Sequence, residues 1–311
     1  MNLAEFDGMS FEAKLAAAFD NYDLACYAII DAAQDGALLQ KFAKESLSTV
    51  SKCLLPAAIE SDMEDYSPHL LALSPLAADS DAWLDLLSHG AAHPAKFTLL
   101  VSTLDFDALW ANLSEFAEIE LPDETTMIFA FWDPAILGTL VGQESDKTLH
   151  VPVGVLTERQ RARLLQGVTT WWYWDREGNT HQIVPAGGPE SDMAHLVPLP
   201  LRLSQVQVDM LVEAGVPDQL LALLQENQPM LLERIPLQQQ YRRAEKHLLE
   251  ARRNKLFGMR DILNYTCAAI IYGEAMYSDP AILSLLARVR EGKLAFDDAV
   301  PLFPGPSKSE W

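Results

Sequence analysis

Few side chains in this sequence combine the types and the spacing that metal binding or catalysis requires. His89 and His93 have the i,i+4 spacing with which two imidazoles on one helix can bind zinc, but Gly90 and Pro94 argue against a continuous helix, and no H-E-x-x-H pattern occurs. An acidic trio could attract a cation, but its spacing matches no calcium loop; its members are Asp62, Glu64 and Asp65. The sequence also lacks a G-x-S-x-G elbow, a G-x-G-x-x-G fingerprint and a phosphate-binding loop. We therefore predict no enzymatic activity, no cofactor and no metal site, and keep an enzyme with an unfamiliar site as the lesser alternative.

Charge is distributed unevenly along the 311 residues, whose formal net charge is −21. Residues 1–230 contain 11 Lys and Arg against 34 Asp and Glu, whereas residues 231–311 contain 12 against 10. Binding to nucleic acid or to an anionic membrane needs clustered cations, so we expect neither partner for the acidic part. A basic protein is the partner that such a surface favours, because opposite charge speeds encounter. Solubility alone is the other explanation of the negative charge.

The strongest amphipathic pattern is the helix expected over residues 237–257. One stripe of it is apolar and should face the core; the stripe contains Leu237, Tyr241, Ala244, Leu248 and Ala251. Arg242, Lys246 and Arg253 lie on the opposite side, joined by Arg260 if the helix continues, and we call these four residues the basic ridge. The basic ridge is either an ordinary solvated face or a docking surface, facing the acidic part of the chain or a partner.

Aromatic side chains are concentrated in one expected strand. Trp171, Trp172, Tyr173 and Trp174 are consecutive, and alternate side chains of a strand point to opposite faces. One face should pack into the first lobe. For the other face, packing is the first interpretation. A protein interface is the second, because Trp and Tyr are frequent in interaction hot spots, and sugar stacking is the third.

Strands and helices alternate up to about residue 185. We expect helices over residues 10–20, 35–48, 80–88, 106–116 and 157–166. We expect strands over residues 25–30, 70–73, 97–101 and 125–132, followed by a hairpin of residues 169–174 and 181–184 that closes the sheet. A parallel return between strands needs a crossover such as a helix, so the alternation predicts an α/β lobe, mixed α+β, with a partly parallel sheet.

The pattern then becomes helical throughout. The predicted domains are an α/β lobe over residues 1–185, a Pro- and Gly-rich connector over 186–200, a helical lobe over 201–303 and a mobile tail over 304–311. Gly215 should end one helix of the second lobe, and Pro217 should begin the next. Residues 259–277 are apolar nearly all round, so this helix is either central in its lobe or part of a groove for a partner's apolar helix.

The clearest local pattern is the TTMIFAFWDPAILGTLV run of residues 125–141, where an apolar stretch meets a helix at Trp132, Asp133 and Pro134. Asp133 can accept hydrogen bonds from the free N–H groups of the first helical turn. Pro134 suits the next position because it has no N–H. These residues predict a structural corner between a strand and a helix, and the helix cap explains their types without a chemical role.

This corner, with CYAIIDAA at residues 26–33 and WWYW at residues 171–174, resembles the Tap or TEC family of adaptors that load toxins onto the bacterial type VI secretion spike. The resemblance runs in order from about residue 24 to about residue 183, and more thinly through residues 203–229. Related sequences often have arginine where this chain has Ala130 and Ala135. The resemblance therefore implies no role in this chain for the arginines found at these two positions in related sequences.

The resemblance implies a non-enzymatic effector chaperone, or adaptor, that acts by protein–protein interaction. Its partners would be a secreted effector protein, a toxin, and the spike-tip protein of the VgrG type. The first lobe would be the shared framework, and the second the source of cargo specificity. The alternative from another class is an immunity-type inhibitor of a basic toxin.

The N-terminal residues and the cysteines bear on localisation. The first 25 residues lack the basic start and apolar core of a secretory signal. Cys26, Cys53 and Cys267 form no C-x-x-C pair and give an odd count. We therefore expect a cytoplasmic bacterial protein in which the three cysteines are small buried apolar groups.

Overall fold

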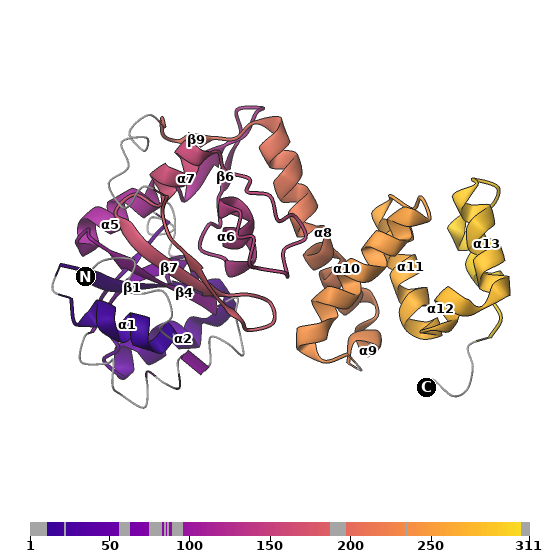
Figure 1. Ribbon diagram of the computed structural model, residues 1–311, viewed down its shortest axis with the longest axis horizontal. Helices are drawn as coiled ribbons and strands as arrows, with labels where there is room; N and C mark the ends of the chain where they lie inside the picture. Colours follow the sequence, from indigo (N-terminus) through magenta and orange to yellow (C-terminus); the bar gives the residue numbers. More distant parts are fainter. Residues whose placement is uncertain are drawn as a thin grey trace. The chain divides into compact units, whose positions relative to one another are not determined.

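The computed structural model describes residues 11–21, 23–55, 63–74, 83, 85, 87–88, 96–186, 197–233 and 235–305. The chain divides into two compact units, Met1–Val212 and Glu213–Trp311 (Figure 1). A sheet with helices forms the first unit, and the described part of the second is helical, which confirms the mixed α+β fold class. The first unit extends beyond the predicted lobe of residues 1–185, because strand β9 (Leu201–Arg202) and the start of helix α8 (Gln205–Asn227) belong to it.

The first unit is built on a six-stranded sheet with the strand order β2-β3-β1-β4-β7-β8. Its strands are β1 (Ala25–Asp31), β2 (Ser48–Cys53), β3 (Pro68–Leu73), β4 (Phe97–Ser102), β7 (Val168–Trp174) and β8 (Thr180–Ile183). Every pair of neighbours in it is antiparallel. The predicted hairpin is confirmed, since β7 pairs with β8 and β8 forms one edge of the sheet.

The strand directions show how far the expected parallel pairing goes. β1 is followed by helix α2 (Ala32–Lys44) and then by β2, a strand that the sequence patterns did not predict. Both β1 and β2 run antiparallel to β3, so the crossover through α2 does return parallel to its starting strand. However, β3 lies between them. Local periodicity can predict the strands and the helix of a crossover. It cannot predict that a strand from later in the sequence lies between the two strands that the crossover joins.

Both faces of the inner strands β1, β3 and β4 are buried, which explains why these strands are largely apolar, whereas the edge strand β2 is mostly exposed. Alternate residues of β1 point to opposite faces: Tyr27 and Ile29 belong to one core, Ala28 and Ile30 to the other. The core of Tyr27 also contains side chains from α5 (Phe106–Ser114), α6 (Pro134–Val141) and α7 (Glu158–Leu164). The core of Ala28 contains side chains from α1 (Phe11–Phe19) and α2. The sheet is therefore the middle layer of the first unit.

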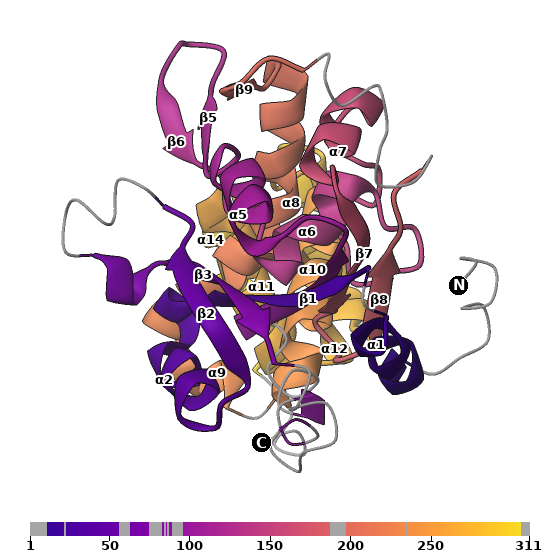
Figure 2. The same ribbon diagram turned by 90° about the vertical axis from the view of Figure 1, so that its left-hand side faces the viewer.

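A second, smaller sheet has three strands in the order β6-β5-β9 (Figure 2). β5 (Glu118–Glu120) pairs antiparallel with β6 (Thr126–Ile128) and parallel with β9. This parallel pair is the one that the described strands contain. β9 follows the last strand of the six-stranded sheet in the sequence, so the chain returns to pair with β5 from a distant part of the sequence.

The strand predicted over residues 125–132 is too long, because β6 ends at Ile128. The chain turns at the next residues: the Phe131 N–H donates to the Phe129 carbonyl at 2.7 Å, and the Asp133 N–H donates to the Ala130 carbonyl at 3.0 Å. The side chains of Phe129 and Phe131 are buried. The aromatic run that the sequence predicts to be part of a buried strand is therefore a buried turn.

Helices form the described part of the second unit, with the end of α8 as its first element. They are α9 (Pro229–Leu232), α10 (Leu237–Arg253), α11 (Met259–Tyr272), α12 (Ala275–Ser278), α13 (Pro280–Arg290) and α14 (Phe296–Ala299), followed by a 3-10 turn over Val300–Leu302. Helix α13 begins at a cap, because the Asp279 carboxylate accepts from the N–H groups of Ala281 and Ile282 and Pro280 follows at the first helical position. The helix expected over residues 259–277 is interrupted at Gly273, whose φ is 52°.

Helix α8 contradicts the prediction that Gly215 ends one helix and Pro217 begins another, because it runs unbroken for 23 residues. A proline inside a helix removes one hydrogen bond and costs about 3 kcal/mol. Packing offsets this cost on both sides: Val208 packs against the core of the first unit, and Leu220 lies in the core of the second. Tertiary burial thus overrides the local stop and start signals.

The predictions about membrane helices and cysteines can be compared with the structure. No helix in the described residues is long and apolar enough to cross a membrane. Cys26 and Cys53 are buried, whereas Cys267 is partly exposed, and all three are free thiols.

Of the helix predicted over residues 80–88, residues 83, 85, 87 and 88 are described and are helical. Most of the predicted connector, residues 187–196, lies outside the described residues, as do His89 and His93.

Candidate functional site

The structural corner is confirmed at its helical end. The Asp133 carboxylate accepts a hydrogen bond from the Ala135 N–H at 2.8 Å, and Pro134 occupies the first helical position of α6. Trp132, just before the cap, is 5% exposed and lies in the core of the first unit. The corner is therefore a buried support, as the cap interpretation of its residues requires.

The same corner meets strand β1 at Asp31. The Asp31 carboxylate caps α2 by accepting from the Ala33 N–H at 3.0 Å. Burial raises the pKa of Asp31, while hydrogen bonding from Ala33 and from the Trp132 side chain acts in the opposite direction. Asp31 and Trp132 belong to the two segments, residues 26–33 and 125–141, whose sequence resembles effector adaptors. Those segments thus form one connected piece of scaffold.

The aromatic strand β7 is buried on both faces. Trp171 and Tyr173 lie in the core shared with Tyr27, and Trp172 and Trp174 lie in the core shared with Ala28. None of these four side chains is more than 2% exposed. They pack in the interior and leave no exposed aromatic surface for the protein interface or the sugar stacking considered for this strand.

Helix α10 places three members of the basic ridge on one exposed side. Arg242, Lys246 and Arg253 are exposed, whereas Leu248, on the opposite side, is completely buried. The predicted apolar stripe is buried apart from Leu237 at the start of the helix, which is 65% exposed. The ridge does not reach Arg260, because α10 ends at Arg253 and Arg260 lies on α11, where it pairs with Asp297 at 2.8 Å. From here on, the basic ridge means Arg242, Lys246 and Arg253.

The contacts of the basic ridge leave its charges open to solvent. Arg253 pairs with Glu250 at 2.6 Å, yet its side chain remains 70% exposed. The Lys246 ammonium lies 4.9 Å from the centre of the Tyr277 ring. Leu249, 41% exposed, lies on the same side of the helix. The ridge is thus an exposed surface in which cations surround an apolar side chain.

A buried histidine close to the ridge does not add to its charge. His247 is 6% exposed, and its Nδ1 lies 2.9 Å from the Tyr277 hydroxyl. Burial, helped by the charges of Lys246 and Arg243, lowers the pKa of His247 to about 4. The imidazole is therefore neutral at physiological pH, and the charge of this surface comes from lysine and arginine alone.

Helix α11 fills the centre of the second unit. Ile262, Tyr265, Ala268 and Ala269 are buried in its core, and Tyr265 packs against Phe296 with ring centres 5.7 Å apart. The buried Thr266 hydroxyl donates to the Ile262 carbonyl at 2.8 Å, so it adds no unsatisfied polar group. The central-helix interpretation of this segment accounts for its nearly uniform apolar character.

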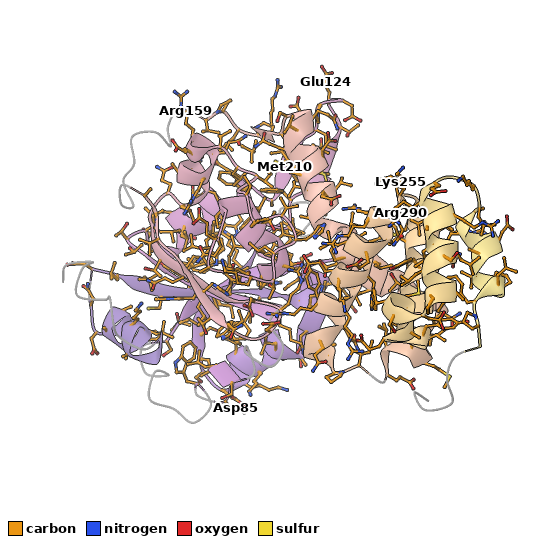
Figure 3. All side chains as sticks on the ribbon, turned by 45° about the vertical axis from the view of Figure 1, so that its right-hand side comes forward. Asp85, Glu124, Arg159, Met210, Lys255 and Arg290 are labelled. Atoms are coloured by element: carbon orange, nitrogen blue, oxygen red, sulfur yellow. The ribbon has the colours of Figure 1, made fainter. Side chains whose placement is uncertain are left out.

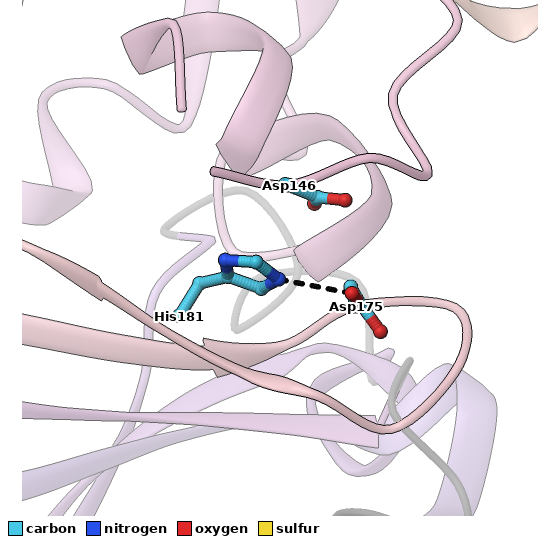
Figure 4. Close-up of side chains that lie close together, drawn as sticks. All are labelled: Asp146, Asp175 and His181. Carbon is cyan, nitrogen blue, oxygen red and sulfur yellow. Dashed lines mark hydrogen bonds and ion pairs between the residues drawn. The ribbon is translucent and has the colours of Figure 1, made fainter. Parts of the chain in front are cut away.

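A cluster that the sequence patterns did not single out joins the β7–β8 hairpin to the loop after α6. Asp146, Asp175 and His181 are all buried, and one potential ligand atom from each lies within 4.8 Å of the others (Figure 4). His181 Nε2 lies 2.9 Å from Asp175 Oδ2, and Tyr173 donates its hydroxyl hydrogen to Asp146 Oδ2 at 2.9 Å. The Tyr173 and His181 rings are stacked, with centres 5.3 Å apart.

Each carboxylate of the cluster already has several hydrogen-bond donors. Asp175 accepts from the N–H groups of Glu177 and Asn179, at 2.8 and 2.9 Å, and from the Asn179 side chain. Burial alone would raise the pKa of Asp175, but the donors, led by His181, outweigh it and lower the pKa to about 2. Asp146 accepts from the Thr148 N–H and hydroxyl, at 2.8 and 2.7 Å.

These contacts decide what the cluster can do chemically. A metal ion would need a free ring nitrogen of His181, but Nε2 is bonded to Asp175 and Nδ1 lies 3.0 Å from the Ser145 hydroxyl. Ser145, His181 and Asp175 do follow the order of a nucleophile, a base and an orienting acid. The Ser145 oxygen also accepts from the Gln143 side chain at 2.9 Å, which uses one of its two lone pairs and ties the hydroxyl into the network. We interpret the cluster as a satisfied network that fixes the hairpin.

Two of the three residues of this cluster could have been indicated by the sequence. Asp175 and His181 flank the turn of the predicted hairpin, and polar residues beside a strand rich in aromatic side chains are a recognisable pattern. Asp146 carries no such pattern, because it lies in an irregular loop. The other acidic groups considered at the sequence level are different: Glu64 and Asp65 are exposed on a 3-10 turn, and Asp62 lies outside the described residues.

One surface groove lies between α5 and α7, with a volume of about 490 Å³. Its charged lining residues pair with each other, since Arg163 Nη2 lies 2.6 Å from Glu115 Oε2 and Arg163 also donates to Asn112. Its remaining lining is apolar or amide, for example Leu199 and Gln166. The groove therefore offers no acid–base pair for catalysis.

Comparison with known families gives one match. The model of the family described as Domain of unknown function (DUF4123) matches residues 26–150, which run from β1 to the loop after α6. Neither the curated proteins nor the solved structures gave a significant match. The matched region contains both segments that meet at Asp31 and Trp132. This part of the first unit is therefore similar to the domain that the family model describes.

Proposed function

We propose that this chain is a non-enzymatic adaptor of the bacterial type VI secretion system, which binds one effector in the cytoplasm and helps to load it onto the spike-tip protein. The observation that carries the proposal is an overlap. The family model matches residues 26–150, and within them lie residues 26–33 and 125–141, where the sequence resembles effector adaptors. Those segments are joined through Asp31 and Trp132, so they act as one structural unit.

Burial and charge support a division between scaffold and contact surface. Most of the residues that carry the resemblance are buried and support a shared framework, whereas residues 125–128 at the start of the second segment are exposed. Partner choice is left to exposed groups. Residues 1–212 contain 11 Lys and Arg against 31 Asp and Glu, a net charge of −20, whereas residues 213–311 contain 12 against 13, a net charge of −1. The acidic unit favours a basic partner, and the basic ridge of α10 favours an acidic one. Two surfaces of opposite preference suit a protein that holds two different partners.

The proposed mechanism is a set of linked binding equilibria without a covalent step. Burying an apolar segment of the effector stabilises a soluble complex, and release follows when the spike-tip protein competes for part of that surface. An immunity-type inhibitor would use the same acidic surface. It differs in abolishing the activity of the toxin and in having no affinity for the spike.

The experiment is affinity capture of the tagged chain from its native cell, followed by mass spectrometry. We expect a toxin and a spike-tip protein to be recovered together. Recovery of neither would contradict the adaptor function.

The basic ridge is tested in the same assay with Arg242→Glu, Lys246→Glu and Arg253→Glu combined. The side chains are exposed, and each such contact is worth less than about 1 kcal/mol, so the melting temperature should change by only a few degrees. A matched control carries Lys255→Glu, Arg288→Glu and Arg290→Glu, which change the charge equally at exposed positions outside the ridge. We expect the ridge variant to lose one partner and the control to keep both. Equal capture by both variants would show that the ridge is only a solvated face.

A further inference from the structure

The outer edge of the small sheet is formed by an exposed, apolar strand. All three residues of β6, Thr126, Met127 and Ile128, are exposed, with Met127 at 47% and Ile128 at 55%. β6 is the terminal strand in the order β6-β5-β9, and Figure 2 shows it on the outside of its hairpin. In the described part of the chain, no strand pairs with its outer side.

The register of the hairpin identifies the backbone groups on that outer side. The Leu121 N–H donates to the Thr125 carbonyl at 2.8 Å, and the Phe129 N–H donates to the Ala117 carbonyl at 2.9 Å. Hydrogen-bonded pairs alternate along an antiparallel ladder, so Met127, opposite Ile119, is the next hydrogen-bonded position. The N–H and C=O groups of Thr126 and Ile128 therefore point away from β5.

Natural edge strands are usually protected by a charge, a proline or a bulge. The edge strand β2 of the large sheet has two such features, a register shift between Ser48 and Val50 and the cation of Lys52. The sequence of β6, Thr-Met-Ile, has neither a charge nor a proline, and its pairing with β5 is regular. β6 is short, with three residues, but an edge that lacks a charge, a proline and a bulge and exposes apolar side chains can accept a further strand.

The charges around β6 define the partner. The hairpin carries Glu118, Glu120, Asp123 and Glu124, and residues 97–146 contain ten Asp and Glu but no Lys or Arg. Glu118 lies directly opposite Ile128, so its carboxylate shares a face with that side chain. Glu124, at the tip of the hairpin, points away from the molecule in Figure 3. Arg202 supplies one cation, which pairs with Glu120 at 3.0 Å.

We propose that β6 accepts an extended segment of a partner polypeptide, which adds a strand to the small sheet. The segment alternates between basic side chains, on the face shared with Glu118, and apolar side chains, on the face of Met127. Strands lie about 4.8 Å apart, so a lysine on the added strand reaches past Ile128 to the Glu118 carboxylate. Main-chain hydrogen bonds to Thr126 and Ile128 supply affinity, and the alternating side chains supply specificity. The inference deepens the proposed adaptor function, because it specifies how one partner attaches.

The first test uses the full chain and a peptide of about eight residues, the usual length of a strand, in which Lys and Val alternate. We expect this peptide to slow amide hydrogen exchange at Thr126 and Ile128. A peptide in which Glu and Val alternate should have no effect. Absence of slowing, slowing at β2 instead, or equal binding of the acidic peptide would overturn the proposal.

Variants of Ile128 make the test specific. Ile128→Pro removes an outward N–H that the hairpin does not use, and Ile128→Lys introduces a like charge for the basic peptide. Each should weaken peptide binding at least about tenfold. Val50→Lys is the matched control, since Val50 is 48% exposed on the edge strand β2, and it should leave binding unchanged. If Ile128→Pro fails to fold, Ile128→Lys decides; equal loss in Ile128→Lys and Val50→Lys would contradict the proposal.

Capture from the native cell separates this inference from the adaptor function. If wild type captures toxin and spike-tip protein and Ile128→Lys captures both equally well, the strand-addition inference is wrong while the adaptor function stands. If wild type captures neither but the basic peptide still protects β6, the adaptor function is wrong and the acceptor edge stands.

Discussion

Replacing Asp175 with asparagine removes one buried negative charge while leaving the shape of the side chain almost unchanged. In the structure, Asp175 is 4% exposed, and its carboxylate accepts from His181, from Asn179 and from the Glu177 N–H. An amide group can accept at only one of its two terminal atoms. The variant therefore turns one acceptor into a donor that faces the donors of His181 and Asn179.

The size of the effect follows from the hydrogen bonds to Asp175, expressed either as a pKa difference or as bond energies. The pKa of Asp175 is lowered from 3.8 to about 2, and such a difference corresponds to about 2 kcal/mol of stability at neutral pH. Hydrogen bonds to a charged group are worth about 1.5–3 kcal/mol. We expect Asp175→Asn to lower the free energy of unfolding of the first unit by about 2 kcal/mol at pH 7.

The sign of the pH dependence follows from the lowered pKa. A carboxylate whose pKa is lower in the folded state stabilises the fold above its unfolded pKa, and this stabilisation is lost as pH falls through the folded pKa. The window here runs from about pH 4 down to about pH 2. By pH 3, wild type should have lost roughly 1 kcal/mol of this contribution, so its advantage over the variant should be about half as large as at pH 7.

Urea unfolding followed by tryptophan fluorescence measures these quantities, because all the tryptophans except Trp311 lie within residues 1–212. The free energies of wild type and Asp175→Asn are compared at pH 7 and pH 3. A difference below about 0.5 kcal/mol at pH 7 would refute the network as a stabilising element. A difference equal at the two pH values would refute its assignment to the charge of Asp175.

Three further substitutions test the local structure by the same unfolding assay. Asp133→Ala should cost about 1 kcal/mol, because it removes the cap acceptor for the Ala135 N–H; a cost no larger than that of the exposed control Asp107→Ala would contradict the cap. Gly138→Ala should lower the free energy of unfolding by about 1–3 kcal/mol, because the new methyl group would lie 2.4 Å from the Tyr173 hydroxyl oxygen. An unchanged free energy would mean that α6 does not approach β7 so closely. Gly215→Ala should raise the free energy of unfolding by about 0.5–1 kcal/mol, because Gly215 is inside α8 and nothing lies within 4 Å of the added methyl group. A lower free energy of unfolding would contradict the unbroken helix.

Local chemistry predicted the helix starts well. Asp133 with Pro134 caps α6 as predicted, because a cap depends on residues within one turn. The same local chemistry begins α7, at Thr157 with Gln160, and α13, at Asp279 with Pro280. Alternation and turn residues likewise predicted the β7–β8 hairpin. These features need no knowledge of distant residues.

The features that sequence patterns did not predict depend on tertiary contacts. Helix α8 continues through Pro217 because cores on both sides hold it. Arg260 is separated from the basic ridge because the chain turns after α10, where Lys255 has a φ of 62°. The buried network needs Asp146 and His181 to meet, and only the fold brings that loop and strand β8 together.

We propose that this chain presents two surfaces to other polypeptides and holds a toxin for delivery. The most direct measurement mixes the purified chain with the captured toxin and spike-tip protein, and follows both the mass of the complex by light scattering and the activity of the toxin. We predict one complex that contains all three proteins, from which the toxin recovers full activity. A chain that silences the toxin and never associates with the spike-tip protein would contradict the claim and identify an inhibitor.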